Sequence, residues 1–483
     1  MKWYELTALA GFEGVGSNPE IADLQYDSRK AEKGSVFFCI RGESSDGHRF
    51  AAQAVEQGAC ALVCEELIPD LEVPQLIVAD SRDALAKMAE AFYGFPHKKL
   101  KIIGVTGTNG KTTATHLIKH ILDDYGKQTA LMGTNHIIIG DRVIPATHTT
   151  PESLEISGYL KEMTDAGCEY LVMEVSSHAL KQGRVSALDF KIAAFTNLTQ
   201  DHLDYHKTFD DYLQAKQLLF AGLSEENQGR GVVNYDSPYC ADFLSVTKVP
   251  VKTYGLKDGA DFQGKNIVMD ANGTSFELLY EGSRYPVKMN LIGDFNVYNA
   301  LTAIAAVEAV GIPLSFISQS LSCAKQVKGR FEKIKEKFGP TVIIDYAHTP
   351  DGLQNILETA NKLGAKRVIL VFGCGGDRDR TKRPVMGKIG GTLSDFALIT
   401  SDNPRTEEPM SIIRMVEEGV KESGGAYEIR CDRREAIHDA VLMANDDDLV
   451  VIAGKGHEDY QIIGTEKHHF DDFEEVKKAL ALC

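Results

Sequence analysis

The sequence lacks any long apolar run. No stretch of 18 apolar residues occurs, so no membrane-spanning helix is expected. The N-terminal stretch MKWYELTALAGFEGVG has acids and glycines where a signal peptide needs an apolar core. We therefore expect no export and no membrane partner, and place the protein in the cytoplasm.

Paired cysteines are also missing. The nine cysteines include no CxxC pair, and the closest two, Cys60 and Cys64, are four positions apart. This spacing favours reduced thiols over a disulfide framework or a zinc site.

Positive charge is in deficit: 52 Lys and Arg stand against 69 Asp and Glu, a formal net charge of −17. The balance argues against a nucleic-acid partner. Anionic small molecules can still bind where backbone N–H groups, basic side chains and metal ions gather locally.

Repeats and low-complexity tracts are absent, and 483 residues exceed what a single core usually organises. Junctions rich in basic residues, Gly or Pro occur at residues 92–101 and 324–340. The sequence therefore predicts an α/β protein of three domains. We expect a mixed α/β domain at 1–98, a central P-loop ATPase-like domain at 99–328 and a doubly wound, Rossmann-like domain at 329–483.

The third segment has the clearest pattern. The apolar runs TVIIDYA, RVILVFG, FALITSD and DLVVIAG alternate with helical stretches, as in a parallel, doubly wound sheet. The polar motifs GCGGDRD, DNPR and GKGHE each follow one of these strands directly. Since ligands bind at the carboxyl ends of parallel strands, we expect a pocket there.

The strongest single motif is VTGTNGKTT, in which an apolar strand runs into Gly107, Gly110, Lys111 and Thr112 and a helix with 3/4 apolar spacing follows. Glycines and a helix N-terminus can cradle phosphate. Lys111 can reach the outer phosphates and Thr112 can bind Mg²⁺. The general pattern has Gly where Val105 stands, so the alternative is a tight strand-to-helix turn.

A metal site is predicted beside this loop. Glu174 ends a predicted strand and His202 follows another, so both should lie at one sheet edge. Each has a simpler alternative, Glu174 as a cap or ion pair and His202 as a satisfied loop residue. Lys216 lies on the apolar face of a predicted helix in TFDDYLQAKQLLF. Its amine either extends past the core to water or is buried and neutral, in which case it can add CO₂ and become an anionic carbamate ligand.

Arg405, in TSDNPRTEEP, follows Pro404 in a short polar loop of this acidic chain. It either pairs with Glu407 or Glu408 or waits for the anion of a ligand. A guanidinium binds a carboxylate through two parallel hydrogen bonds, which also fixes its direction.

Taken in order, TGTNGKTT, EVSSHAL, TNLTQDHLDYH, AKQLLF, GDFNVYNALTAIAA, KGRFE and DYAHTP resemble the motifs of the Mur ligase family over nearly the whole chain. The resemblance is strongest to its diaminopimelate-adding members, and the Val105 variant is usual in this family. It implies an ATP-dependent ligase of peptidoglycan precursor synthesis, acting as a monomer on ATP, meso-diaminopimelate and the sugar nucleotide UDP-muramoyl-dipeptide.

The resemblance also implies four groups of site residues. ATP would be bound by Gly107, Thr108, Asn109, Gly110, Lys111, Thr112, Thr113, Asn296, Arg330 and Asp345. The UDP-sugar-peptide would be bound by Ser28, His48 in the SSDGH loop, Thr149, Thr150, Ser176, Gln182 and Arg184; His148 stands where the family often has Asn. Diaminopimelate would be bound by Arg378, Asp402, Asn403, Pro404, Arg405, Gly454 and Glu458. Catalysis would depend on Lys111, Glu174, His202 and Lys216, with Mg²⁺ held by Thr112, Glu174, His202 and the Lys216 carbamate.

The implied reaction passes through an acyl phosphate on the D-glutamyl carboxylate, and domain closure about residues 327–337 is expected. Two other ligases remain as alternatives, a lysine-adding Mur ligase and a folylpolyglutamate-type ligase. A nucleotide-dependent regulatory or binding protein is the alternative of another class. It would leave Lys216 and the Gly/Arg pocket at 373–380 unexplained.

Overall fold

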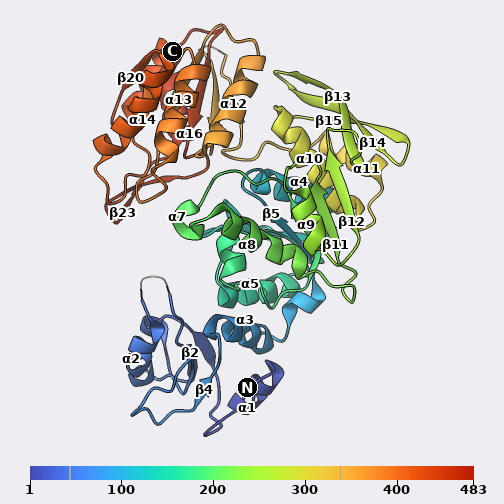
Figure 1. Cartoon of the computed structure of the whole chain (residues 1–483), viewed down its shortest axis with the longest axis vertical. Coiled ribbons are helices and arrows are strands. Elements are labelled where there is room, and N and C mark those ends of the chain that lie inside the picture. Colours follow the sequence, from blue (N-terminus) through green and yellow to red (C-terminus); the bar gives the residue numbers. More distant parts are fainter. Residues whose placement is uncertain (43–44, 338, 483) are drawn as a thin grey trace.

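The computed structural model describes residues 1–42, 45–337 and 339–482. Three sheets follow one another along the long axis of the molecule, with the N-terminus near one end and the C-terminus near the other (Figure 1). No helix in these ranges is both long enough and apolar enough to cross a membrane.

The first sheet is parallel, with the strands in chain order. It consists of β1 (Asp23–Gln25), β2 (Ser35–Phe38), β3 (Ala61–Cys64) and β4 (Gln75–Ile77). The helices of this segment are α1 (Trp3–Leu9), η1 (Ser28–Lys30), η2 (Gly47–Phe50), α2 (Ala51–Glu56) and α3 (Ser81–Phe92). The chain's one tryptophan, Trp3, is buried in the core on one face of this sheet.

The second sheet is the largest and mixed. Its parallel centre has the spatial order β12 (Val251–Gly255), β11 (Arg230–Asn234), β10 (Phe190–Phe195), β5 (Lys101–Thr106), β9 (Tyr170–Glu174), β6 (Thr129–Met132). Further strands extend both edges. Beyond β12, β13 (Phe262–Asp270) adds in parallel and is followed by the antiparallel strands β14 (Gly273–Tyr280) and β15 (Ser283–Met289). Beyond β6, β7 (His136–Ile139) and β8 (Arg142–Pro145) add in antiparallel fashion. Its helices are η3 (Pro96–Lys99), α4 (Lys111–Asp124), α5 (Ser153–Asp165), α6 (Ser177–Lys181), α7 (Leu203–His206), α8 (Phe209–Ala221), α9 (Cys240–Val246), α10 (Asp294–Glu308) and α11 (Leu314–Leu321).

The third sheet has the order β16 (Glu332–Ile334), β17 (Thr341–Asp345), β21 (Leu449–Ala453), β18 (Val368–Phe372), β19 (Phe396–Ile399), β20 (Tyr427–Ile429), all parallel except β16. Helices α12 (Pro350–Lys362), α13 (Lys382–Leu393), α14 (Pro409–Ser423), α15 (Arg433–Met443) and α16 (Asp472–Leu480) accompany it, and β22 (Tyr460–Ile463) pairs with β23 (Glu466–His469) as a separate hairpin. Buried clusters lie on both faces of the sheet, as a doubly wound fold requires.

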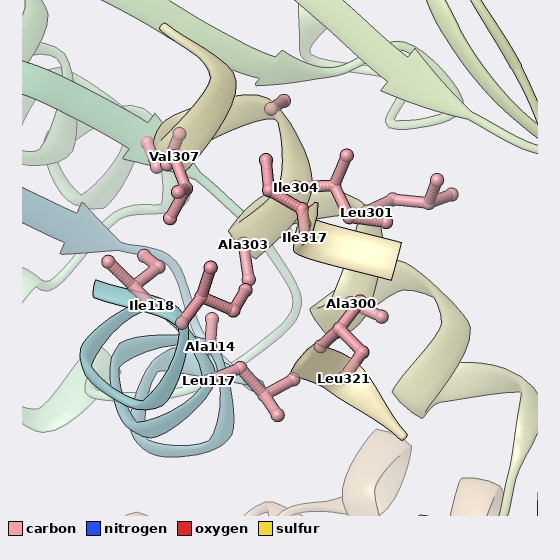
Figure 2. Close-up of a cluster of buried hydrophobic side chains, with 14 of the residues drawn as sticks. Ala114, Leu117, Ile118, Ala300, Leu301, Ala303, Ile304, Val307, Ile317 and Leu321 are labelled. Carbon is pink, nitrogen blue, oxygen red and sulfur yellow. The ribbon is translucent and has the colours of Figure 1, made fainter. Parts of the chain in front are cut away.

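The helix that follows the phosphate-binding motif is fixed by its packing. Leu117 and Ile118 of α4 lie against Ala303 and Ile304 of α10 in one buried cluster, to which α11 adds Ile317 (Figure 2). Small residues on α10 let the two helices approach closely. This packing anchors α4 beneath the central sheet and so fixes its N-terminus at the sheet edge.

The eight cysteines within the described ranges are free thiols. Cys323, just after α11, and Cys431, just after β20, are exposed, and Cys60 is half-buried. The other five are buried.

The three-domain α/β class predicted from the sequence is confirmed by these sheets. Every strand quoted above from an apolar run is present, and the expected helices begin at Lys111 and Phe209. The domain limits at 98 and 328 stay a prediction, as does the hinge, whose segment contributes β16 to the third sheet.

Candidate active site

The phosphate-binding motif forms a loop between β5 and α4. Gly107 and Gly110 have φ of +150° and +86°, which favours glycine at both positions. A Cβ at Gly110 would lie 2.3 Å from Asn299 Oδ1 of α10, so the loop also has no room for a side chain there. The N-terminus of α4 therefore opens on a tight backbone loop, which suits phosphate binding.

The Lys111 side chain folds back onto this loop and hydrogen-bonds to its backbone. Its Nζ donates to the carbonyls of Gly107 and Thr108, both at 2.9 Å. Burial lowers the pKa of the Lys111 amine below its ordinary value. Asn109 and Thr113, also predicted to bind ATP, lie in the loop and in the first turn of α4; Asn109 N–H donates to Asn197 Oδ1 at 2.9 Å.

Glu174 and His202 lie at the same sheet edge, as predicted, because β9 and β10 flank β5. Glu174 is fully buried, and its carboxylate accepts from the Thr112 hydroxyl at 3.1 Å and the Thr134 hydroxyl at 3.0 Å. His202 precedes α7 with φ +55°, and burial lowers the pKa of its imidazole to about 3, so the ring is neutral. A neutral imidazole and a carboxylate are both competent metal ligands.

Lys216 is 1% exposed, and its Nζ donates to the carbonyl of Gly107 at 2.8 Å. The amine therefore points into the base of the phosphate loop, and the alternative in which it reaches bulk water is wrong. Burial, together with the nearby Lys111 ammonium, lowers the pKa of Lys216 well below its ordinary value.

The residues present fit a divalent metal held mainly by oxygen ligands, with one imidazole nitrogen. No group of three or more His, Cys, Asp or Glu side chains that could hold a metal occurs in the described part of the chain. Glu174 and His202 both line one cavity. Thr112 adds a hydroxyl, and a carboxylated Lys216 would add a further anionic oxygen. Such a set suits Mg²⁺.

A cavity of about 410 Å³ joins this edge to the third domain. Arg330 Nη2 donates to the Thr112 hydroxyl at 2.9 Å, and its guanidinium lies 4.6 Å from the Tyr346 ring centre. Asn109 Nδ2 donates to Asp351 Oδ2 at 2.7 Å. Two side-chain contacts from the phosphate loop and α4 thus reach the third domain across the cavity.

Two further residues predicted to bind ATP are Asn296, which is buried, and Asp345, which lines the cavity. Asn296 is buried in the first turn of α10, and its amide bridges Ile292 and Asn299. Asp345 lines the cavity and accepts from the backbone N–H groups of Phe331 at 2.6 Å and Ala347 at 2.7 Å. Burial raises the pKa of the Asp345 carboxyl.

Five residues predicted to hold the sugar-peptide form a connected cluster. The Thr150 hydroxyl donates to the Glu174 carbonyl and accepts from Ser176 N–H. Arg184 donates to the Thr150 carbonyl at 2.8 Å and to Gln182 Oε1. Thr149 bonds to Thr134 and lines the cavity, whereas His148 is exposed and bonds only to its neighbour Thr147.

The predicted UDP residues lie in the first domain, apart from the cavity. Ser28 bonds to Gln53 Oε1 at 3.1 Å. His48 is held by Asp46 at one ring nitrogen, at 2.6 Å, and accepts from Glu65 N–H at the other, at 2.9 Å. His48 therefore orders its own loop; Ser44 of the SSDGH motif lies outside the described residues.

Arg405 does not pair with either neighbouring glutamate. Glu407 binds Arg383 and Arg380, and Glu408 caps α14. The Arg405 guanidinium instead donates to the Gly376 carbonyl at 2.8 Å. Its backbone has φ +51° and pairs with the β22–β23 hairpin through Ile462 and Gly464. A strained, doubly held residue of this kind is typical of a ligand site.

The three polar motifs after β18, β19 and β21 do meet at one edge. A Cβ at Gly375 would lie 2.9 Å from Arg405 Nη1 and 3.9 Å from Arg378 Cγ, and one at Gly454 would lie 2.7 Å from Asp402 Oδ2. Pro404 is buried beneath Gly376. Asn403 Nδ2 donates to Glu458 Oε2 at 2.8 Å, and burial raises the pKa of the Glu458 carboxyl.

The amino-acid pocket and the cavity share a wall. Tyr346, which lines the cavity beneath Arg330, donates its hydroxyl to Glu458 Oε1 at 3.4 Å. Tyr346 therefore links the cavity that holds the phosphate loop and the candidate metal ligands to the residues around Arg405.

Sequence reasoning missed several contributors. Tyr346, His348 and Asp351 line the cavity, and their signal was available in DYAHTP and the residue that follows it. Lys455 is fully buried within GKGHE. Thr134 carried no signal, because the loop after β6 has no recognisable pattern.

Comparison with known proteins places the whole chain. Residues 20–93 match the Mur ligase family catalytic domain, residues 105–307 the Mur ligase middle domain, and residues 329–456 the Mur ligase glutamate ligase domain.

Two curated relatives are similar over their full length. A protein of Geobacillus kaustophilus (strain HTA426) named UDP-N-acetylmuramoyl-L-alanyl-D-glutamate--2,6-diaminopimelate ligase is 48% identical over 475 residues, covering 97% of each chain. One of the same name from Halalkalibacterium halodurans is 49% identical over 469 residues, covering 97% of this chain and 96% of the relative. A solved structure of a ligase of that name superimposes with a TM-score of 0.71 at 32% identity, covering 100% of this chain and 99% of the other.

Proposed function

The chain belongs to the Mur ligase family, and on that premise we propose that it is an ATP-dependent ligase that joins 2,6-diaminopimelate to UDP-N-acetylmuramoyl-L-alanyl-D-glutamate. The observation that carries the proposal is the full-length similarity to ligases whose names state this reaction. The product is a peptidoglycan precursor, and the enzyme works as a cytoplasmic monomer.

The reaction has two steps. The D-glutamyl γ-carboxylate attacks the γ-phosphorus of ATP, so that a P–O bond to the acyl group forms and the bond to ADP breaks. The amine of diaminopimelate then attacks the acyl carbon, the C–O bond to phosphate breaks, and the amine gives up one proton. Both partners of the first step are anions, so the site must supply positive charge.

Lys111 and the N-terminus of α4 supply this charge at the phosphates. The Lys111 ammonium is held at the loop by two carbonyls, and ATP phosphates offer it stronger, charged acceptors. Arg330 reaches Thr112 from the third-domain side of the same cavity. Preorganised donors of this kind act where charge moves in the transition state.

Mg²⁺ would be held by Thr112, Glu174, His202 and Lys216 as its carbamate, and when bound it neutralises charge on the phosphoryl group. The amine of Lys216 forms an N–C bond to CO₂ and loses one proton. The buried position of the amine beside the phosphate loop supports this assignment.

Substrates enter from three domains. Thr149, Thr150 and Arg184 hold the peptide end of the sugar nucleotide next to Glu174, while Ser28 and the His48 loop bind the UDP end. The Arg405 pocket binds the carboxylate of diaminopimelate that lies away from the reacting amine. Bringing these ends into line accounts for closure of the domains about the cavity.

The test is an ADP-release assay with purified protein, ATP, Mg²⁺, UDP-muramoyl-dipeptide and a panel of amino acids. We expect release that depends on both the sugar nucleotide and meso-diaminopimelate, with little release for lysine. Preference for lysine would identify a lysine-adding enzyme, and release without the sugar nucleotide would contradict the proposal.

A further inference from the structure

Lys455 is a buried cation with no role in the reaction described above. It lies in the loop after β21 and is 0% exposed. Its Nζ donates to Asn403 Oδ1 and to Glu458 Oε2, both at 3.1 Å. An ammonium is retained at such depth only where it is well paired, so this contact network is tightly specified.

The first consequence concerns Asn403. Its Oδ1 accepts from Lys455 and from Ile462 N–H at 2.9 Å, and its Nδ2 donates to Glu458. Because an ammonium can only donate, Lys455 determines which end of the Asn403 amide faces Glu458. Asn403 and Glu458 are therefore oriented as a pair before a ligand arrives.

The second consequence concerns charge. The pocket contains two carboxylates, Asp402 and Glu458. Lys455 donates to Glu458, and the positive charges of Lys455 and Arg405 both favour the ionised form of Asp402. Two further buried cations have carboxylate partners of their own: Arg433 is matched by Asp472 through bonds of 2.8 and 2.7 Å, and Arg383 by Glu407 through bonds of 3.0 and 2.8 Å. Burial alone would raise the pKa of Asp402, but Lys455 and Arg433 lower it below its ordinary value. Among these groups the charges cancel; Arg378, which the sequence also assigned to the pocket, is exposed to solvent.

A pocket whose cations and carboxylates balance complements a zwitterion. The far end of diaminopimelate carries one ammonium and one carboxylate. The far end of lysine carries only an ammonium, which would leave the pocket with an uncompensated positive charge.

We propose that Lys455 is a positioning residue that sets the charge balance of this pocket, so that the enzyme selects an amino acid whose far end is zwitterionic. This inference rests on the proposed ligase function. It assigns the selectivity against lysine to the charge balance of Lys455, Asp402 and Glu458 as well as to Arg405.

The test compares charge changes of opposite sign in the intact enzyme. Lys455→Met keeps the length of the side chain but removes its charge. We expect kcat/KM for diaminopimelate to fall about tenfold or more, as when a buried polar partner is left unsatisfied, chiefly through KM. The kcat/KM for lysine should fall less, so the preference for diaminopimelate over lysine should become smaller. Glu458→Gln removes one carboxylate, and the preference should then shift in the opposite direction.

Lys467→Met is the matched control. Lys467 is exposed and lies 4.2 Å from the Tyr460 ring, whose other cationic neighbour is Lys455 at 5.6 Å. This variant should keep the wild-type preference within about twofold, since exposed charges contribute little. ATP-analogue binding and thermal unfolding identify variants that retain the fold, and Lys455→Arg, which keeps the charge, should retain the preference.

An unchanged preference in Lys455→Met, or shifts of the same sign in Lys455→Met and Glu458→Gln, would overturn the inference while wild-type activity with diaminopimelate preserves the proposed function. If Lys455→Met does not fold, Lys455→Arg and Glu458→Gln test the inference instead. A changed preference for diaminopimelate over lysine in Lys455→Arg, or an unchanged preference in Glu458→Gln, would then overturn it. A wild-type enzyme with no diaminopimelate-dependent release would overturn both.

Discussion

Lys216 is the residue whose environment most constrains its chemistry. Its amine is buried against the Gly107 carbonyl, and no group of three or more His, Cys, Asp or Glu side chains among the described residues is placed to hold a metal. We expect Lys216→Ala to lose at least about tenfold in activity, as is typical when a group supporting a metal site is removed. Added acetate or formate should restore part of the activity by supplying the missing carboxylate. The measurement is diaminopimelate-dependent phosphate release.

Lys248→Ala, which removes an exposed lysine before β12, serves as the control and should be unaffected. A free Lys216 amine in a crystal structure or intact mass of the active, Mg²⁺-loaded enzyme would be incompatible with the carbamate.

Arg405 gives a second prediction at this scale. Wild-type enzyme should prefer diaminopimelate over lysine, because lysine leaves the guanidinium unpaired, and sites built around a polar group can reject analogues lacking it by roughly 10⁴-fold. Arg405→Ala should lose about 2–5 kcal/mol of transition-state stabilisation for diaminopimelate. The ratio of kcat/KM for diaminopimelate to that for lysine should decrease at the same time. Steady-state kcat/KM for both amino acids measures this.

Arg414→Ala, at an exposed position of α14, should leave both values unchanged. Equal use of the two amino acids by the wild type would mean that Arg405 serves the loop and not the substrate.

How far these residues could be predicted depends on how local their signals are. Three residues have local signals within a few positions: Lys111 follows a glycine-rich loop, Glu174 ends a predicted strand, and Lys216 interrupts the apolar face of a predicted helix. Lys455 and Thr134 have no such signal, because their partners come from distant segments: Asn403 is 52 positions from Lys455, and Glu174 is 40 positions from Thr134. Which alternative holds for Arg405 was likewise decided only by tertiary pairing of Glu407 with Arg383.

At the scale of elements, α4 links the core to the chemistry. Ile118 is fully buried where α4 meets α10 (Figure 2). Ile118→Ala should reduce the local stability by about 2–5 kcal/mol, since the lost methyl groups leave a cavity between two helices. Hydrogen exchange of α4 and α10 amides measures this opening free energy. The affinity for ATP should fall as well, because α4 carries Lys111 and Thr112.

Leu218→Ala on α8 is the control, since Leu218 is 51% exposed and its loss should change stability by no more than about 0.5 kcal/mol. The fluorescence of Trp3, which lies in the first domain, should report an unchanged transition in both variants. Faster exchange throughout the molecule, with a shifted Trp3 transition, would contradict a local role.

Elements were predictable where periodicity was strong. Four strands of the third sheet, β17, β18, β19 and β21, and helices α4 and α8 follow directly from apolar runs and 3/4 spacing, whereas the short strands β16 and β20 were not predicted. The additional strands at both edges of the central sheet were not predicted, because β13–β15 and β7–β8 are half-exposed and their alternation does not specify which edge they join.

At the scale of the whole molecule, binding and chemistry are divided among domains. Lys111→Ala and Thr112→Ala should each abolish turnover, since they remove the phosphate contact and the hydroxyl that joins Arg330 to Glu174. Both should leave UDP binding nearly intact, because Ser28 and His48 lie in the first domain. Calorimetry with the sugar nucleotide and phosphate-release assays measure the two effects.

Wild-type protein and Lys119→Ala, which removes a partly exposed ion pair with Asp123 farther along α4, are the references. Loss of sugar-nucleotide binding in either phosphate-loop variant would show that the division between domains is wrong.

The distribution of thiols allows the distance between two domains to be followed by energy transfer between attached dyes. Cys323 and Cys431 are exposed, one in the central domain and one in the third, on opposite sides of the expected hinge. Replacing Cys60 and Cys483 with Ser would direct a donor and an acceptor dye to these two positions without changing any site residue. The energy transfer between them would then follow the opening and closing of single molecules as ATP, sugar nucleotide and amino acid are added in turn.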